Sequence, residues 1–278
     1  MRDRLLRDGY VVLAIVFVVL RLLAIEPWDD SVDAYAYWAT RSGDLYAAAG
    51  TGLIGSYLYS PAFAQALAPL VWLPWPVFAA AWTALLLAVY RLVVGPRLAL
   101  PLLLFVPIPF EIVSGNVHLL FAAAIAFGFR YPALWALVLL TKVTPGLGLV
   151  WFLVRREWRA LGIALGVTAA IAAVSYLLAP ADWWRWLEVL RRDAAGPLAT
   201  PGWYLPVSLL VRLPLATAIV AWGGLTDRRW TVPVAAALAL PVLWLNGLAI
   251  LAALVPLARA SRSALPMALV RARSQPAA

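Results

Sequence analysis

Residues 132–159 read P-A-L-W-A-L-V-L-L-T-K-V-T-P-G-L-G-L-V-W-F-L-V-R-R-E-W-R. The part from Pro132 to Val154 is an apolar run long enough to cross a bilayer, which takes roughly 20 helical residues. Arg155, Arg156 and Arg159 follow at once, and arginines next to a span mark the cytoplasmic side of a membrane. The stretch therefore predicts a transmembrane helix that ends in the cytoplasm.

The composition extends this interpretation to the whole chain. Of 278 residues, 65% are hydrophobic and only 13% are charged, whereas water-soluble domains carry about 25% charged residues. The sequence therefore predicts an all-α, polytopic membrane bundle and excludes an ordinary soluble domain. The absence of Cys and the presence of one His, His118, exclude Cys-ligated metals and His clusters, and we expect neither a metal nor another cofactor.

The arginines also bear on partners and topology. The formal net charge is +9, but the basic residues lie at the ends of apolar runs and in the tail, so we expect membrane lipids and no nucleic acid as partners. Arg2, Arg4 and Arg7 precede a run that ends near Ile25, which predicts an uncleaved signal anchor. Both termini are therefore expected in the cytoplasm.

The apolar runs predict about ten transmembrane helices in one domain, residues 1–261. A basic cytoplasmic tail, residues 262–278, is expected to be disordered. The runs at 98–110 and 117–129 are shorter than a perpendicular span, so tilted, broken and re-entrant helices remain open. Two outer loops are expected, at 27–60 and 180–205. Each has an aromatic segment that suits an interfacial helix, D-A-Y-A-Y-W-A in the first and Trp183, Trp184 and Trp186 in the second.

The first outer loop is the expected place of the chemistry. It holds Asp29, Asp30, Asp33 and Asp44, and a carboxylate at the membrane surface can take a proton from an attacking hydroxyl. We assign Asp33 as the general base, with Asp29 or Asp30 as the fallback. The alternative is that these carboxylates are simply solvated.

Lys142 is the sole lysine and lies inside an apolar run. In a continuous helix, the thirteen positions to Arg155 would separate the two by roughly 20 Å, beyond the membrane midplane. A charge at that depth needs a partner or a polar cavity and is a functional candidate. The alternative is that Lys142 pairs with Glu111 or a backbone carbonyl to hold helices together.

Arg185, Arg191 and Arg192 lie in the second outer loop and depart from the positive-inside pattern. Guanidinium groups match phosphate oxygens in a bidentate manner, so we assign these three and Lys142 to the phosphate of a lipid carrier. Binding of lipid headgroups without a catalytic role is the alternative.

Four segments in this order resemble glycosyltransferase family 87, the polyprenyl-phosphate-mannose-dependent mannosyltransferases of the membrane-embedded C-type superfamily. They are D-A-Y-A-Y-W-A with G-D-L-Y, then Y-L-Y-S-P-A-F-A-Q-A-L-A-P-L-V-W-L-P, then S-G-N-V-H-L-L-F, and L-L-T-K-V-T-P-G-L-G-L-V-W-F-L-V-R-R-E-W-R-A-L. The last two are similar to the family's Gly-Gln/Asn-x-x-Leu and Lys-x-x-Pro segments. They cover roughly the first two thirds of the chain.

The resemblance implies a hexosyltransferase that moves mannose from a polyprenyl-phosphate donor to a lipid or glycan acceptor, with inversion. The predicted topology places the active site on the outer face of the plasma membrane, and the excess of Arg over Lys indicates a bacterial source. The enzyme is expected to serve cell-envelope or lipoglycan biosynthesis. The loop Asp, here Asp33, would be the base. Family members often carry a His in the late outer hairpin, where this chain reads W-L-N-G with Asn246. The substrate-binding set is expected to be Tyr35, Tyr37, Tyr59, Asn116, His118, Trp244 and Asn246.

Two other functions remain open. A transporter or lipid flippase would also be polytopic with buried charges, and the short helices around Gly115 favour it, whereas the lack of an internal repeat does not. A non-catalytic, degenerate member of the family would account for the missing His and the short chain.

Overall fold

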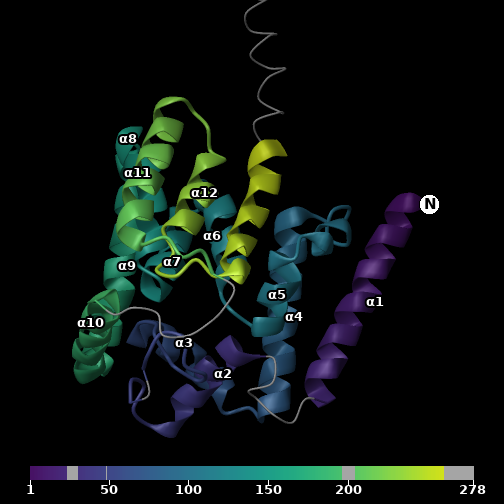
Figure 1. The fold of residues 1–278 in the computed structure, drawn as a ribbon, viewed down its shortest axis with the longest axis horizontal. Helices are drawn as coiled ribbons and strands as arrows, with labels where there is room; N and C mark the ends of the chain where they lie inside the picture. The colour runs from purple at the N-terminus through teal and green to yellow at the C-terminus, as the bar shows by residue number, and fades with distance from the viewer. Residues whose placement is uncertain (24–30, 48, 196–203, 260–278) are drawn as a thin grey trace, which may run out of the picture.

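The computed structural model describes residues 1–23, 31–47, 49–195 and 204–259. In this part of the chain the regular structure is helical, and one isolated antiparallel bridge pairs Tyr204 with Trp244. The predicted all-helical fold is confirmed. Figure 1 shows the long helices side by side, with α2 and α3 at one end of the bundle and the N-terminus at the other. The expected tail, 262–278, lies outside the described residues.

The elements run in the following order along the chain. They are α1 (Arg2–Leu23), α2 (Val32–Trp38), η1 (Ala39–Ser42), α3 (Pro61–Val71), α4 (Trp75–Val94), η2 (Pro101–Leu104), α5 (Pro107–Ser114), α6 (His118–Gly128), η3 (Pro132–Leu134), α7 (Trp135–Thr141), η4 (Thr144–Leu149), α8 (Val150–Val154), α9 (Trp158–Leu178), α10 (Pro180–Ala195), α11 (Leu209–Leu225), α12 (Thr231–Leu238) and η5 (Leu245–Ala253). Proline occupies the first turn of α3, α4 and α5, where its missing N–H costs no hydrogen bond.

Two helices in the described ranges, α4 and α9, are long and apolar enough to cross a membrane, and the bent pair α5–α6 would make a third span. At 1.5 Å per residue, a helix of 20 residues such as α4 is about 30 Å long, the thickness of a hydrocarbon core. α1 is also long, but Arg7, Asp8 and Arg21 interrupt its apolar stretch. These spans establish a membrane protein without establishing the expected ten crossings.

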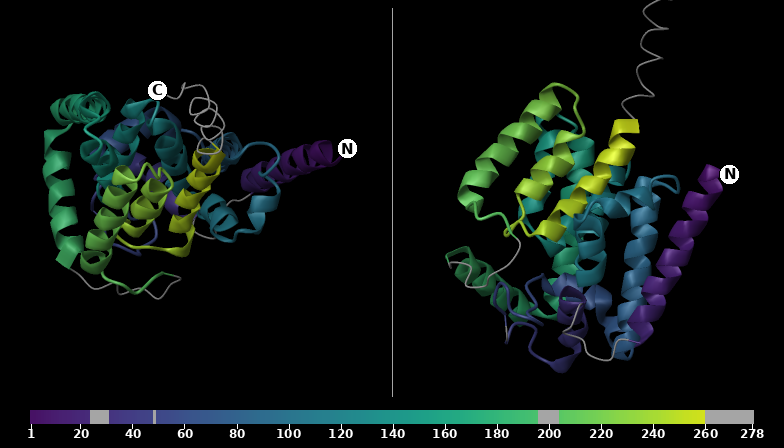
Figure 2. Two further views of the ribbon diagram at one scale, coloured as in Figure 1. Left: turned by 90° about the horizontal axis from the view of Figure 1, so that it is seen from above. Right: turned by 45° about the vertical axis from the view of Figure 1, so that its right-hand side comes forward.

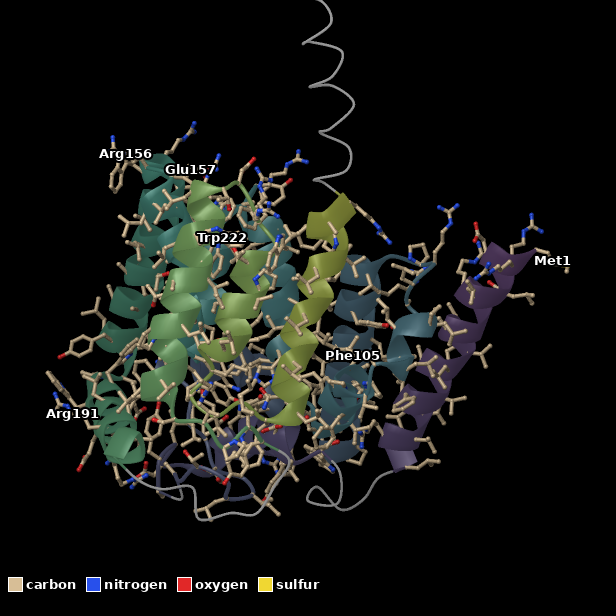
Figure 3. The ribbon with its side chains drawn as sticks, turned by 45° about the horizontal axis from the view of Figure 1, so that its top comes forward. Met1, Phe105, Arg156, Glu157, Arg191 and Trp222 are labelled. Carbon is tan, nitrogen blue, oxygen red and sulfur yellow. The ribbon has the colours of Figure 1, made fainter. Side chains whose placement is uncertain are left out.

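The arginines that follow or precede the long helices gather at one end of the bundle, here called the arginine-rich end. Arg155 after α8 forms an ion pair of 3.0 Å with Asp227 after α11, and Arg97 after α4 forms one of 2.9 Å with Asp3 at the start of α1. Figure 3 shows Met1, Arg156 and Glu157 at this end, well away from Arg191 of α10. The arginines at the ends of these helices therefore lie at one end of the bundle, and α10 lies at the other.

Two apolar runs that looked continuous are broken. The 98–110 run is not one helix, because it divides into η2 and α5, and α5 continues through Glu111 to Ser114. α5 and α6 then meet at 116°, which excludes one tilted, continuous helix and fits either a broken span or a re-entrant pair. The predicted helix over 132–154 is wrong. Lys142 has an extended backbone between α7 and η4, and Pro145 removes the N–H that would have bonded to the carbonyl of Thr141.

Both aromatic loop segments form helices, as predicted. α2 buries Ala34, Ala36 and Tyr37, and the indole of Trp38 beside them donates to the carbonyl of Leu73 at 2.8 Å. These contacts fix α2 against the bundle, whereas a solvated loop helix would have few of them.

α10, in the second loop, turns back beneath α9. Its Trp183 donates to Ser175 Oγ at 3.0 Å, and its Trp186 donates to the carbonyl of Leu58 at 3.2 Å. The two indole rings meet edge to face at 5.4 Å. α10 therefore packs against the segment before α3, at the end of the bundle that carries α2 and α3 (Figure 2).

Arg212, in the first turns of α11, is buried and closes the turn that follows α12. Its guanidinium donates to the carbonyls of Val207 at 2.8 Å, Leu238 at 2.6 Å, Leu240 at 2.8 Å and Pro241 at 2.9 Å. The last residues of a helix leave carbonyls without intrahelical partners. One side chain therefore satisfies the end of α12 and positions the hairpin that carries Asn246.

We expect Arg212→Met to destabilise the protein by at least about 3 kcal/mol, because several buried carbonyls lose a charged donor. In detergent, the midpoint of thermal unfolding should fall by roughly 5–10 °C. The matched control is Arg191→Met at an exposed arginine of α10. Equal midpoints for the two variants would show that Arg212 does not hold the hairpin.

Candidate functional site

α2 rests directly on the turn that joins α5 to α6. Gly115 in this turn has φ +74°, and a Cβ there would lie 2.6 Å from Cβ of Ala34. The carbonyl of Gly115 accepts a hydrogen bond of 2.7 Å from the indole of Trp82 in α4. Glycine at this position permits both the left-handed backbone conformation and the close approach of α2. This approach holds Asp33 next to Asn116.

Asp33 is the acidic residue of α2 and faces the bundle. Its carboxyl lies among protein atoms, while part of the residue remains accessible. Burial raises the pKa of Asp33, and the charge of Lys142 and a hydrogen bond from Asn116 oppose part of that rise. A carboxylate with a raised pKa holds a proton more tightly than one in water, which suits a general base.

Asn116 connects Asp33 to Lys142. Its Oδ1 accepts from Lys142 Nζ at 3.2 Å, from the N–H of Val117 at 2.8 Å and from the Tyr59 hydroxyl at 3.5 Å. These donors fix the orientation of the amide, which leaves Nδ2 to donate toward Asp33. Lys142 is itself half-buried, and its ammonium lies 5.6 Å from the centre of the Tyr59 ring.

His118 is buried at the N-terminus of α6 and lies between Lys142 and Glu111. Lys142 Nζ is 2.9 Å from Nε2, and Glu111 Oε2 is 2.8 Å from Nδ1. Because an ammonium group can only donate, Nε2 accepts and Nδ1 carries the ring proton. The N–H of His118 also donates to Glu111 Oε1 at 2.5 Å. Glu111 therefore fixes the imidazole, and the imidazole fixes Lys142.

The hairpin after α12 completes the far side of this cluster. Asn246 is buried and donates to Ser114 Oγ at 3.1 Å, and its amide also hydrogen-bonds the carboxyl of Glu111. The next residue, Gly247, lies close to the His118 ring. We call Asp33, Asn116, Lys142, His118, Glu111 and Asn246 the polar network.

A buried tyrosine group lies beside the polar network. The hydroxyls of Tyr37 and Tyr59 are 3.1 Å apart, and the Tyr57 hydroxyl donates to the carbonyl of Ser60 at 2.8 Å. Burial raises the pKa of Tyr57 and Tyr59, and the carboxylate of Asp33 raises the pKa of Tyr59 further. These phenols stay neutral and act as hydrogen-bond donors.

The structure brings together many of the residues that the sequence singled out. Asp33, Lys142, Asn116, His118 and Asn246 belong to the polar network, and Tyr37 and Tyr59 lie against it. They come from α2, the loop before α3, the α5–α6 turn, the break after α7 and the last hairpin. The alternative interpretation, a pairing of Lys142 with Glu111, is found only indirectly, because His118 lies between the two side chains.

The other candidates have different contacts. Arg185 forms an ion pair of 3.1 Å with Asp44, Arg192 donates to the carbonyl of Ala49, and exposed Arg191 points outward from α10 (Figure 3). None of these contacts reaches the polar network. Tyr35 packs on Trp38 and Trp75, and Trp244 packs on Tyr204. Asp29 and Asp30 lie outside the described residues.

Glu111 is the member that the sequence did not single out as a site residue. It is fully buried, and a carboxylate in an apolar segment is the same signal that drew attention to Lys142.

Comparison with known families decides the class of protein. Residues 57–273 match the sequence model of glycosyltransferase family 87. The chain belongs to glycosyltransferase family 87. This glycosyltransferase is therefore a membrane enzyme that uses a sugar donor and an acceptor. No curated protein and no solved structure matches the chain.

The family match begins at residue 57 and so leaves out α2 and Asp33. It includes the α5–α6 turn, Lys142 and the last hairpin. The assignment of Asp33 in this glycosyltransferase therefore depends on the contacts of α2 with the matched region.

We expect Gly115→Ala to lower transferase activity by about tenfold or more, because the added methyl group displaces α2 and shifts Asp33 away from Asn116. The matched control is Gly43→Ala. Gly43 also has positive φ, but its Cβ would meet nothing within 4 Å, so this variant tests backbone strain without the contact. If both variants lose activity equally, the contact with α2 does not matter.

Proposed function

We propose that this glycosyltransferase moves mannose from a polyprenyl-phosphate donor to a hydroxyl group of a lipid or glycan acceptor, with inversion at the anomeric carbon. The observation that carries the proposal is the polar network. Its two partly accessible members are an acid, Asp33, and a cation, Lys142, and Asn116 lies between them. The supporting members are buried and fixed by hydrogen bonds.

The reaction needs one acid–base group and one group for the phosphate. Asp33 takes the proton of the acceptor hydroxyl as its oxygen attacks the anomeric carbon. The bond from that carbon to the phosphate oxygen breaks, and polyprenyl phosphate leaves with one more negative charge than the phosphate had in the donor. A single displacement inverts the anomeric centre. The phosphate is a competent leaving group, so the step requires no metal.

Lys142 stabilises the charge that develops on the leaving phosphate. Its ammonium is positioned by Asn116 and His118 before any substrate arrives, so little reorganisation is needed during the reaction. Of the arginines expected to bind the phosphate as well, Arg185 and Arg192 have other contacts and Arg191 points outward from α10. We therefore assign this role to Lys142 alone.

The last hairpin lacks a His, but another element supplies an imidazole to the polar network. Asn246 takes the hairpin position and bonds to Glu111, which in turn holds His118. The hairpin thus supports an imidazole supplied by α6. This favours an active enzyme over a degenerate member that has lost its site.

The expected location is the outer face of a bacterial plasma membrane. It follows from the polar network lying toward the end of the bundle that carries α2, away from the arginine-rich end, since arginines favour the cytoplasmic side. A lipid-linked donor and acceptor would reach this end from the bilayer.

The bent pair α5–α6 is the feature that favours a transporter, because broken helices line many transport sites. Proteoliposomes containing polyprenyl-phosphate-[³H]mannose and a short mannoside lipid acceptor separate the two functions. We expect labelled product with one additional mannose and the opposite anomeric configuration to the donor. Movement of intact donor between leaflets without product would support the flippase instead. If neither product formation nor movement of the donor is observed, the result would indicate a non-catalytic member.

A further inference from the structure

A cavity of about 500 Å³ lies at the arginine-rich end, away from the polar network. Its walls come from three segments that are distant in sequence: the first turns of α1, the residues after α4, and the end of the helical segment Leu245–Arg259, here called the last helix. The charged residues among them are Asp3, Arg4, Arg7, Arg97 and Arg259. The proposed transfer reaction uses none of them.

The cavity carries a strong positive charge. Four guanidinium groups and one carboxylate line it, for a net charge of +3. Asp3 is bound to Arg97 at 2.9 Å, and Arg7 is bound to Asp8 at 2.9 Å. These pairs are exposed and are worth little in water, so an anion with several oxygens can compete for the same guanidinium groups.

The backbone holds this cavity in shape. Gly95 ends α4 with φ +81°, and a Cβ at this position would lie 3.1 Å from Nη1 of Arg259. The Nη2 atom of Arg259 donates to the carbonyl of Val94 at 3.1 Å. α1 is fixed on the other side, because the Tyr10 hydroxyl donates to the carbonyl of Leu87 at 2.6 Å. The cations are therefore attached to helices that pack together.

We propose that this cavity binds the phosphate headgroup of an anionic phospholipid. A membrane protein presents its helix ends at the depth of lipid headgroups, and basic pockets between transmembrane helices bind anionic headgroups there. Guanidinium forks match phosphate oxygens in pairs. The bound lipid would tie α1 to α4 and to the last helix.

Native mass spectrometry of the full chain in a neutral detergent tests this site. We expect phosphatidylglycerol to be retained over phosphatidylcholine, and Arg4→Gln/Arg259→Gln to reduce that preference by about fivefold or more. The matched control is Arg156→Gln/Arg159→Gln, which removes two arginines near the arginine-rich end but outside the cavity. It should change the preference by less than about twofold.

Asp3→Asn gives a change of the opposite sign. It removes the one carboxylate and releases Arg97, so retention of phosphatidylglycerol should rise, which misfolding would not produce. Equal losses in the cavity variant and the control would overturn the proposal. Displacement of the lipid by inorganic phosphate at equal concentration would identify a site for free phosphate and would also overturn it.

Discussion

Asp33→Asn is expected to lower mannose transfer by about a thousandfold, within the usual range of 10²–10⁴ for the loss of a general base. The amide keeps the size of the side chain but cannot accept a proton from the attacking hydroxyl. The measurement is the initial rate of [³H]mannose incorporation in proteoliposomes at saturating donor. Asp44→Asn is the matched control, because Asp44 lies in the same loop and pairs with Arg185. Equal rates for Asp33→Asn and wild type would remove Asp33 from the mechanism.

The same variant should not be less stable than wild type. Burial raises the pKa of Asp33, so above that pKa the charged carboxylate opposes folding, and the neutral amide removes this cost. We expect an unchanged or higher midpoint of thermal unfolding at neutral pH. A large fall in the midpoint would mean that lost activity reflects misfolding.

The pH dependence of transfer has a predictable sign. Transfer needs the deprotonated carboxyl, so the rate should fall as the pH drops through the pKa of Asp33 in the folded protein. Because that pKa lies above the ordinary aspartate value, the fall should occur at higher pH than for a solvated aspartate. The acid limb of kcat/KM for the acceptor measures it, and its disappearance in Asp33→Asn would assign the limb to this group.

Lys142→Met is expected to lower transfer by about 10²–10³-fold, because the leaving phosphate loses its preorganised cation. KM for the polyprenyl-phosphate donor should also rise, while KM for the acceptor should change little. The variant also removes the hydrogen-bond donor to His118 and Asn116. If Lys142 has a structural role as well, the thermal stability of the variant should also be lower.

A second variant separates the two roles of Lys142. In Lys142→Met the carboxylate of Glu111 stays buried without the nearby cation, whereas Lys142→Met/Glu111→Gln removes that buried charge and leaves only the partly accessible Asp33 without the cation. We expect the double variant to recover thermal stability and to remain inactive. If it recovers transfer as well, Lys142 serves only to neutralise Glu111.

The sequence indicated the residue types of the site better than their geometry. Glu111 and His118 are seven positions apart, which in a continuous helix would separate them by about 10.5 Å along the axis. The turn at Gly115 instead brings their side chains to 2.8 Å. The short apolar runs on either side of Gly115 left a break in the helix open, but the angle of 116° between α5 and α6 appears only in the tertiary structure.

Lys142 shows the same limit. Its charge within an apolar run identified Lys142 as a functional candidate, and this identification does not depend on whether the run forms one continuous helix. Its depth in the membrane was calculated for an unbroken helix, although Thr144-Pro145-Gly146, which begins two residues after it, is a pattern typical of a helix break. Similarly, the guanidinium groups of α10 matched a phosphate by chemistry, but only the tertiary structure shows that Arg185 pairs with Asp44.

The interruptions at Gly115, at Lys142 and before Asn246 meet in one region of the bundle, and this bears on how a sugar would be recognised. In an unbroken helix the backbone amides and carbonyls hydrogen-bond to one another, whereas an interruption leaves some of them available to a ligand. A hexose has hydroxyl groups on every side and would find partners here in the main chain as much as in the side chains. Preference for one hexose over another should then respond more to changes in these turns than to exchanges among the surrounding aromatic residues.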